Sequence, residues 1–479
     1  MNYRLRSGVD LLEKKGSFFL LSRNPLSMLR LNKSLAELVG RGANGQTITP
    51  SAPEAAVMEQ LVTKGFVEQV WSAPKLSGDL PHVSIIIPVM DRAEELRRCL
   101  DSLSLLSYPH DKIHIIVVDD GSKDSSPEVA REYGALVLPS GGIGRGPAAA
   151  RNIGASRAQG EILAFIDSDC SASSSWLDEL IPAFEDKRTA AVGGQVDGLC
   201  SESAVDRYEA VMSSLSLGSR SRSGSSGHDT FYLPSCNLLV RRCAFASAGG
   251  FEESMHVGED VDLTWRLRDA GWSISYLPAG NILHEHRSSV RSFMSRRFDY
   301  GTSEGMLQLR HPERRKQMVI PPLLATVLIL CLVAPLADWW TVPLAAGILL
   351  ADVVAIRARF TRRSLPISIG TLLAGRMRAL GSLIYYLCYH LIRYYAIPLI
   401  ALSLIVPGPW PLLIPAVVLI TASGVDFSIK KPDLSFFHYC GIYFLEQIAY
   451  GAGVFWGCLS RKCFSSYRVV ILKHVEAAA

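Results

Sequence analysis

The stretch Ile162-Leu163-Ala164-Phe165-Ile166-Asp167-Ser168-Asp169 is an apolar run that stops at a pair of acids. Two earlier apolar runs show the same pattern: residues 83–87 end at Pro88, and residues 113–118 end at Asp119-Asp120. Short runs rich in β-branched residues are typical of buried strands, and the segments between these runs have helical spacing. The expected strands are residues 83–87, 113–118 and 162–166, and the expected helices are residues 94–106 and 125–133. Alternating strands and helices predict an α/β fold with a parallel sheet, which binds ligands at the carboxyl ends of its strands.

The acids at these strand ends suit a sugar diphosphate. Asp167 and Asp169 are two residues apart and project to the same side of a strand end, where they can hold a divalent cation, Mg²⁺ or Mn²⁺. Such a cation would offset the charge on a departing diphosphate. Asp119 or Asp120 can accept a hydrogen bond from the imide of uracil, because the turn at Gly121-Ser122 allows close approach to the backbone. A lone acid at a strand end is usually a cap or a turn residue, but acids on successive strands predict a nucleotide-sugar site.

A glycine-rich loop follows the expected strand near Val137-Leu138 and leads into a helix at residues 147–152. A dinucleotide site would need Gly-x-Gly-x-x-Gly directly after the first strand, so the position of this loop excludes that assignment. Arg145 and Arg151 are interpreted as guanidiniums that face nucleotide or phosphate oxygens. A structural ion pair or a solvated surface position is the alternative for each.

Two further motifs offer a general base and a third metal ligand. Glu259 and Asp260 precede a segment with helical spacing, so the helix dipole would stabilise the charged form of Asp260 that a general base needs. Glu259 is the rival for this role, and one of the two acids can serve only as a helix cap. His284 and His286 share one face of a strand-like segment, so either can be a metal ligand. Two histidines without a nearby cysteine pair are not a structural zinc pattern.

The chain resembles family 2 glycosyltransferases with the GT-A fold over about residues 81–310. The motifs that carry this resemblance occur in order at residues 83–89, 117–122, 146–152, 165–169 and 258–266. The resemblance implies an inverting, single-displacement transfer from a nucleoside-diphosphate sugar. It places Asp169 on the metal, Asp119 or Asp120 on the nucleobase, and Asp260 as the base that deprotonates the acceptor. The implied nucleotide-sugar site comprises Pro88, Asp91, Asp119, Asp120, Arg145, Arg151, Asp167 and Ser168. The implied metal ligands are Asp169 and Asp167, with His284 or His286.

One departure from the family concerns processive synthases. These enzymes carry Gln-x-x-Arg-Trp after the catalytic acid, whereas this chain has Phe293-Met294-Ser295-Arg296-Arg297-Phe298. The difference argues against a cellulose or hyaluronan synthase. The formal net charge of +4 is too small to predict nucleic-acid binding. The ten cysteines form no Cys-x-x-Cys pair, and the N-terminus has no apolar signal region, so reduced thiols in a cytosolic compartment are expected.

Residues 318–424 are expected to form membrane helices. Residues 318–337 are long enough to cross a bilayer, and residues 341–356 form a second apolar run. Arginine and lysine flank this pair on both sides, so the positive-inside rule places both flanks and the catalytic domain at the cytoplasmic face of the membrane. Residues 394–406 and 410–423 are shorter than full spans and are expected to be re-entrant or interfacial. Residues 425–479 form an expected interfacial tail. A buried helical domain is the alternative for the whole region.

Residues 1–72 are predicted to be a small α+β module, followed by a linker at residues 73–82 and the transferase domain at residues 83–310. The segment Met28 to Ala36, closed by Gly65-Phe66-Val67, resembles the winged-helix element that binds leader peptides of ribosomally made, modified peptides. A unit this small is usually a binding module, because it is too small to hold its own active site.

The order of module, transferase and membrane segments is similar to that of the glycosyltransferases of the mycofactocin system. This similarity implies an acceptor derived from the mycofactocin precursor peptide and UDP-glucose as the donor of a short β-linked glucose chain. The residues themselves predict only nucleotide-sugar transfer at a membrane, with a peptide-binding module attached. The alternatives are a transferase acting on a polyprenyl phosphate or a cell-envelope polysaccharide, a non-enzymatic peptide-binding scaffold, and a small transporter. The intact acids argue against the scaffold, and a transporter would need more spans.

Overall fold

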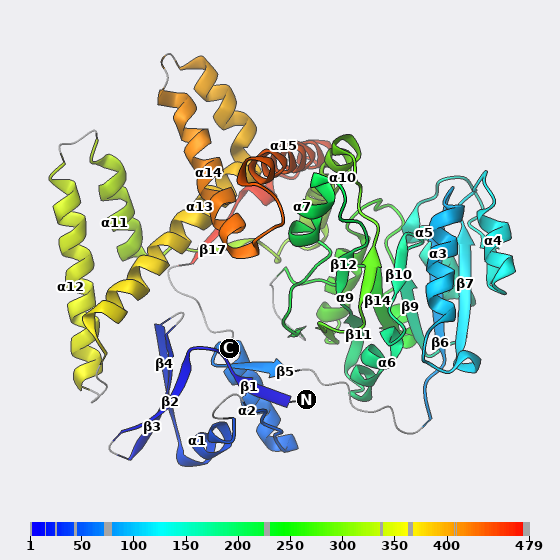
Figure 1. Cartoon of the computed structure of the whole chain (residues 1–479), viewed down its shortest axis with the longest axis horizontal. Helices are drawn as coiled ribbons and strands as arrows, with labels where there is room; N and C mark the ends of the chain where they lie inside the picture. The colour runs from blue at the N-terminus through cyan, green and yellow to red at the C-terminus, as the bar shows by residue number, and fades with distance from the viewer. Residues whose placement is uncertain are drawn as a thin grey trace. The chain divides into compact units, whose positions relative to one another are not determined.

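The computed structural model describes residues 2–14, 16–23, 26–42, 46–70, 79–224, 230–335, 339–362, 367–406, 408 and 410–472 (Figure 1). Most of the predicted linker lies outside these residues. The chain divides into two compact units. The large unit comprises residues 73–316 and 392–468, and the small unit comprises residues 1–72, 317–391 and 469–479. The large unit therefore contains a C-terminal segment in addition to the region predicted as the transferase domain.

An eight-stranded sheet forms the centre of the large unit, in the order β13-β15-β11-β14-β9-β6-β7-β8. Strands β9, β6, β7 and β8 run parallel, as predicted. Strand β14 runs antiparallel to both of its neighbours, and β13 is antiparallel to β15, so the sheet is mixed rather than wholly parallel. The strands are β6 (Val83–Val89), β7 (Ile113–Asp119), β8 (Leu136–Pro139), β9 (Ile162–Ile166), β11 (Thr189–Gly193), β13 (Arg222–Gly224), β14 (Asn237–Arg241) and β15 (Ser273–Tyr276).

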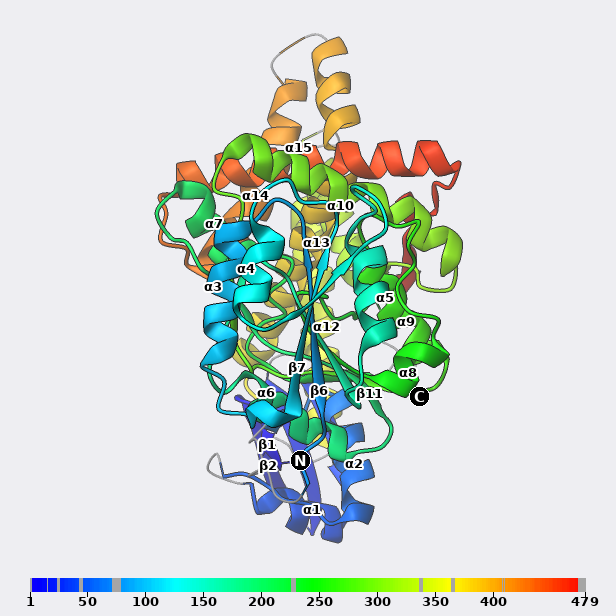
Figure 2. The same ribbon diagram turned by 90° about the vertical axis from the view of Figure 1, so that its right-hand side faces the viewer.

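Helices cover both faces of this sheet, with α3 and α4 on one side and α5 and α9 on the other (Figure 2). Helix α5 packs tightly because it has glycine at position 154, where a Cβ atom would lie 2.5 Å from Cγ2 of Ile86. Phe165 of β9 packs edge-on against Phe251, with 5.1 Å between the ring centroids, and this contact is part of the buried core. The helices are α3 (Ala93–Ser104), α4 (Ser126–Glu132), α5 (Pro147–Arg157), α6 (Trp176–Leu180), α8 (Arg242–Ser247) and α9 (Glu259–Asp269).

A second, three-stranded sheet lies beyond the end of β9, in the order β10-β16-β12. Its strands are β10 (Cys170–Ala172), β16 (Ile282–His284) and β12 (Val196–Gly198). Strands β10 and β16 are antiparallel, and their register pairs Cys170 with His284. This pairing brings the histidine segment to the acids that follow β9.

Helices α10 (Val290–Arg310) and α15 (Phe436–Arg461) run side by side in the large unit, as Figures 1 and 2 show. Glycines make their close approach possible. A Cβ atom at Gly453 would lie 2.0 Å from the carbonyl oxygen of Phe298, and one at Gly301 would lie 2.3 Å from that of Tyr450. Helix α7 (Ala204–Met212) also packs against α15. The C-terminal helix, predicted as part of an interfacial tail, is therefore integrated into the large unit.

The N-terminal part of the small unit is a small α+β structure with its own core around Tyr3, Leu20, Val39 and Met58. Strands β2-β3-β4 form an antiparallel sheet, and β1 pairs with β5. The elements are β1 (Asn2–Leu5), β2 (Val9–Lys14), β3 (Ser17–Arg23), β4 (Leu26–Leu31), α1 (Lys33–Gly40), α2 (Ala52–Thr63) and β5 (Val67–Val70). The segment from Met28 to Ala36 divides between β4 and α1, with Asn32 capping the helix.

The apolar helices are α11 (Pro322–Val333), α12 (Thr341–Arg362), α13 (Ile369–Ile405) and α14 (Trp410–Lys430), and short strands β17 (Gln317–Val319) and β18 (Val470–Leu472) pair with each other. Three helices in the described part of the chain are long and apolar enough to cross a membrane: α12, α13 and residues 413–430 of α14. Helix α11 has only 12 residues, fewer than the predicted first span. Helix α13 has 37 residues, because the segment predicted from residue 394 continues a longer helix.

Candidate active site

Asp120, one of the two candidates for nucleobase binding, holds the glycine-rich loop in place. Its Oδ1 accepts hydrogen bonds from the Ser140 hydroxyl at 2.6 Å and from the Arg145 backbone N–H at 3.0 Å. Its Oδ2 accepts a hydrogen bond from the Gly146 backbone N–H at 2.8 Å. Both oxygens of this buried carboxylate therefore accept hydrogen bonds from the loop, and Asp120 fixes its conformation.

Asp119 is half-buried at the end of β7, where its Oδ1 accepts a hydrogen bond from the Ser122 backbone N–H at 3.0 Å. Asp91 lies in the neighbouring loop and has a φ of +51°, in the left-handed region that few non-glycine residues adopt. It binds the same turn, because its Oδ1 accepts a hydrogen bond from the Lys123 backbone N–H at 2.6 Å. Pro88 lies within β6, opposite Val118 of β7. Asp91 and Asp119 are therefore more exposed than Asp120 at this edge of the sheet.

Arg145 and Arg151 occupy different environments. Arg145 is exposed and donates hydrogen bonds to the Ser140 carbonyl at 2.7 Å and to Glu253 at 3.1 Å. Arg151 is buried and forms ion pairs with Asp167 at 2.6 Å and with Glu259 at 2.8 Å. Burial alone would lower the pKa of Arg151, but Asp167 and Glu259 raise it above its usual value, so the guanidinium stays charged. Arg151 thus forms a structural ion pair, which was one of the two alternatives to a guanidinium that faces nucleotide or phosphate oxygens.

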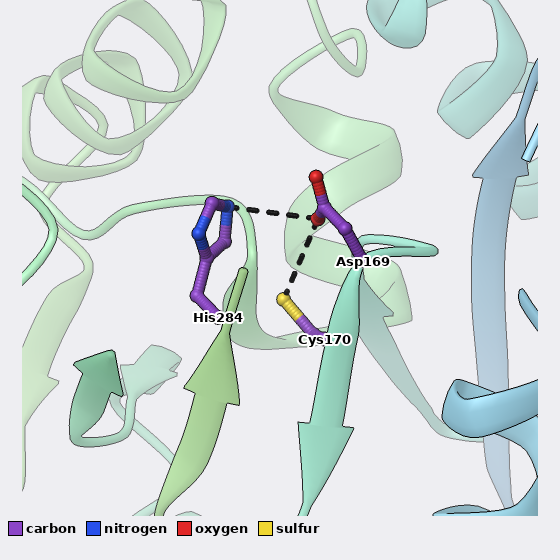
Figure 3. Close-up of side chains that lie close together, drawn as sticks. All are labelled: Asp169, Cys170 and His284. Atoms are coloured by element: carbon purple, nitrogen blue, oxygen red, sulfur yellow. Dashed lines mark hydrogen bonds and ion pairs between the residues drawn. The ribbon is translucent and has the colours of Figure 1, made fainter. Parts of the chain in front are cut away.

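Asp169 and His284 come together at the end of β9, next to Cys170 (Figure 3). His284 Nε2 lies 3.6 Å from Asp169 Oδ1, and Cys170 Sγ lies 3.9 Å from the same oxygen. Arg92 donates a hydrogen bond to the other oxygen, Oδ2. Burial would raise the pKa of Asp169, but His284 and Arg92 outweigh this effect and hold that pKa below its usual range. The carboxylate is therefore charged at neutral pH, as a cation ligand must be.

The chemistry of these side chains suits a divalent cation. A carboxylate and an imidazole are ligands that Mn²⁺ accepts, with the remaining positions open to water and phosphate oxygens. Cys170 offers a soft sulfur ligand, of a kind that Mg²⁺ and Mn²⁺ seldom take, and burial raises the pKa of its thiol well above its usual value. Asp167 is paired with Arg151, and His286 packs against the His284 ring with its Nδ1 near Glu209, so neither is part of this group. Ser168 lies buried in the turn between the two acids.

The two candidates for the general base lie at the first turn of α9. Gly258, with a φ of +83°, precedes the helix and Glu259 begins it. Glu259 is buried against Arg151, and burial, reinforced by the neighbouring Asp260, raises the pKa of Glu259 to about 7. Asp260 is only half-buried, and its carboxylate accepts hydrogen bonds from the backbone N–H groups of Ser235 at 3.1 Å and Val261 at 2.7 Å. Burial still raises the pKa of Asp260, despite these hydrogen bonds. Of the two acids, Asp260 is the more accessible to an acceptor.

Three residues near the site were not singled out from the sequence. Arg92 binds the candidate metal ligand, Cys170 lies beside it, and Ser235 holds Asp260. Arg92 directly follows Asp91 at a strand end, which is a weak signal that sequence reasoning could have used. Ser235 comes from a loop far along the chain, and no local pattern connects it with α9.

Known proteins resemble the part of the chain that carries Asp119, Asp167 and Asp169. Residues 84–247 match the family described as Glycosyl transferase family 2. The chain is 38% identical over 242 residues to the pre-mycofactocin glycosyltransferase of Mycobacterium tuberculosis, a match covering 50% of each protein. It is 32% identical over 207 residues to glycosyltransferase AglE of Haloferax volcanii, covering 42% of this chain and 66% of that protein. The chain thus spans about half the length of the first of these relatives.

A solved structure is also similar, at 20% sequence identity and a TM-score of 0.41. It is a mannosyltransferase from Pyrobaculum calidifontis in complex with GDP-Man and Mn²⁺, and the match covers 69% of this chain and 94% of that one. The α/β sheet with acids at its strand ends and the family match agree on the GT-A fold. Residues 84–247 are thus identified as a domain of glycosyl transferase family 2.

Proposed function

We propose that the protein transfers glucose from UDP-glucose to an acceptor derived from the mycofactocin precursor peptide. The proposal that the protein transfers a sugar rests on one observation. The strand end that carries the candidate cation ligands is connected through Arg151 to the helix that carries the candidate base. Asp169 and His284 lie together at the end of β9, and Arg151 bridges Asp167 to Glu259, beside Asp260. The identities of donor and acceptor rest on the similarity to the mycobacterial relative over half of each chain.

In this mechanism each group has one task. Asp119 and Asp91 bind the nucleoside. Asp169 and His284 would hold a divalent cation, which would supply positive charge to offset that of the leaving diphosphate. Asp260 removes the proton of the acceptor hydroxyl, which then attacks the sugar carbon from the side opposite the diphosphate. One displacement of this kind inverts the configuration at that carbon. Arg151 fixes the distance between the acids on β9 and the base on α9.

The proposed site of action is the cytoplasmic face of a membrane. Three helices in the described part of the chain are long and apolar enough to span it, and arginines lie in the last turns of α12 and in the first turns of α13. Such residues favour the cytoplasmic side. The exposed face of α15 carries Phe437, Phe455 and Trp456, which suit the interfacial region of a bilayer. A polyprenyl phosphate or envelope polysaccharide is the alternative acceptor, favoured by the presence of these helices.

The function is tested by incubating the full chain, in detergent or nanodiscs, with a panel of nucleotide sugars and the candidate acceptors. Mass spectrometry should show a hexose added to the peptide-derived acceptor with UDP-glucose as donor. Transfer only to a polyprenyl phosphate would favour the alternative acceptor over the peptide-derived one. If neither hydrolysis nor transfer were detected with any donor, the assignment of the protein as a transferase would be wrong.

Deletion of residues 1–72 tests the proposed recognition of a peptide. Strands β2 and β4 are the edges of the β2-β3-β4 sheet, and a peptide can bind such an edge as an added strand. The deletion should raise the KM for the peptide-derived acceptor or abolish its modification. Slow hydrolysis of the nucleotide sugar should persist, because Asp169, His284 and Asp260 lie outside the deleted segment. A truncated protein that is folded, membrane-associated and modifies the acceptor at the parental rate would rule out recognition by the module.

A further inference from the structure

His286 lies beside the candidate cation site without belonging to it. Its ring is buried, with its centroid 4.9 Å from that of His284 and the two planes at 40°. Gly198 of β12 leaves room for this ring, since a Cβ atom there would lie 3.2 Å from Cδ2 of His286. Because His286 packs against one side of the His284 ring, its position limits the orientations that His284 can adopt.

A chain of buried charged groups lies next to His286. Nδ1 of His286 lies 3.4 Å from Oε2 of Glu209 on α7. The other oxygen of Glu209 forms an ion pair with Arg297 of α10. Nε of Arg297 lies 3.4 Å from Oε1 of Glu446 on α15, and the hydroxyl of Tyr208 donates a hydrogen bond to the other oxygen of Glu446. The ion chain, defined as Glu209, Arg297 and Glu446, thus joins three helices to the segment that carries His284.

All three members of the ion chain are buried, and each is less than 10% exposed. Charges at such positions are costly unless they are paired, and similar apolar residues would often stabilise a fold at least as well. Stability alone therefore gives a weak reason for this arrangement. A directional arrangement of charges does, however, fix the relative positions of the groups that it connects.

We propose that Glu209, Arg297 and Glu446 are positioning residues that hold His284, through His286, in the orientation that binds the divalent cation. Helix α15 then contributes to metal affinity although no residue of it touches the cation. This inference rests on the proposed function, in which Asp169 and His284 are the ligands. The glycine contacts that bring α10 and α15 together lie one residue from Arg297, at Phe298, and one helical turn from Glu446, at Tyr450.

The test measures Mn²⁺ binding to the full chain by electron paramagnetic resonance, without donor or acceptor. Glu209→Gln and Glu446→Gln should each weaken Mn²⁺ binding by about tenfold or more, the usual effect of changing residues that support a metal ligand. Arg297→Lys keeps the charge but not the planar fork of donors, and should have a smaller effect of the same sign. In the transfer reaction the variants should need more Mn²⁺, with kcat nearly restored at saturating metal.

Glu304→Gln provides a matched control on α10. Glu304 is also buried, and it accepts hydrogen bonds from Lys316 and from the Tyr394 hydroxyl at 2.9 Å, but it touches neither histidine. This variant should lower the thermal unfolding midpoint without changing Mn²⁺ affinity. Parental affinity in all three ion-chain variants would overturn the proposal, as would an equal loss in Glu304→Gln. No Mn²⁺ binding by the parent would contradict the metal assignment instead, so the two failures are distinguishable.

Discussion

Replacing Asp260 by Asn will lower the rate of sugar transfer by about 10²–10⁴-fold, the usual contribution of a general base. Binding of the nucleotide sugar should stay nearly unchanged, because the base acts on the acceptor and not on the donor. The amide keeps the size of the side chain, and its oxygen can still accept a hydrogen bond from Ser235 or Val261. Turnover and donor affinity, measured separately on the purified variant, check this expectation.

The pH dependence of the parent provides a second check on the same residue. Burial raises the pKa of Asp260, so the group takes up a proton at a higher pH than an ordinary aspartate with a pKa of about 3.9. A base works only when deprotonated, so kcat/KM should fall as the pH drops through the raised pKa. The Asn variant should lose this acid limb.

Glu259→Gln distinguishes the two acids of α9. Glu259 is bound to the buried Arg151, so its replacement should disturb the ion pair and reduce both donor binding and stability. If Asp260→Asn weakened donor binding as much as turnover, while Glu259→Gln lowered turnover alone, the roles of the two acids would be exchanged.

The strand ends that carry the site could be predicted from the sequence because a buried strand must stop where charged residues begin. Asp119, Asp167 and Asp169 are visible for this reason, and the predicted strand at residues 162–166 matches β9. Helix α9 was predictable from its periodicity and from the glycine and acids at its start. These signals are local, and they need no information about neighbouring segments.

The partners of these residues depend on packing that local patterns do not encode. The register of β10 with β16 brings His284, and not His286, next to Asp169. Asp120 accepts hydrogen bonds from the glycine-rich loop because of the path that this loop takes. The antiparallel β14 lies between β9, which was predicted, and β11, which was not, and a short apolar run does not reveal the direction of its strand. The integration of α15 with α10 depends on glycines whose role appears only when both helices are placed.

Asp169→Asn should abolish detectable Mn²⁺ binding and lower turnover by several orders of magnitude, with the fold retained. In the described part of the chain, Asp169 supplies the carboxylate in the group of three side chains at this point, with Cys170 and His284, and His284 alone is a poor site for a hard divalent ion. Without the cation, the charge that develops on the leaving diphosphate has little to neutralise it. Mn²⁺ titration and steady-state kinetics measure the two effects separately.

Asp167→Asn is the matched comparison, because Asp167 lies two residues away but is paired with Arg151. This variant should keep most of the Mn²⁺ affinity while donor binding and turnover fall, since the buried guanidinium loses one of its two anionic partners. A chelator should reproduce the Asp169→Asn defect in the parent, and added Mn²⁺ should reverse it in the parent but not in the variant. Full activity of the parent in excess chelator, or unchanged Mn²⁺ binding by Asp169→Asn, would remove Asp169 from the metal site.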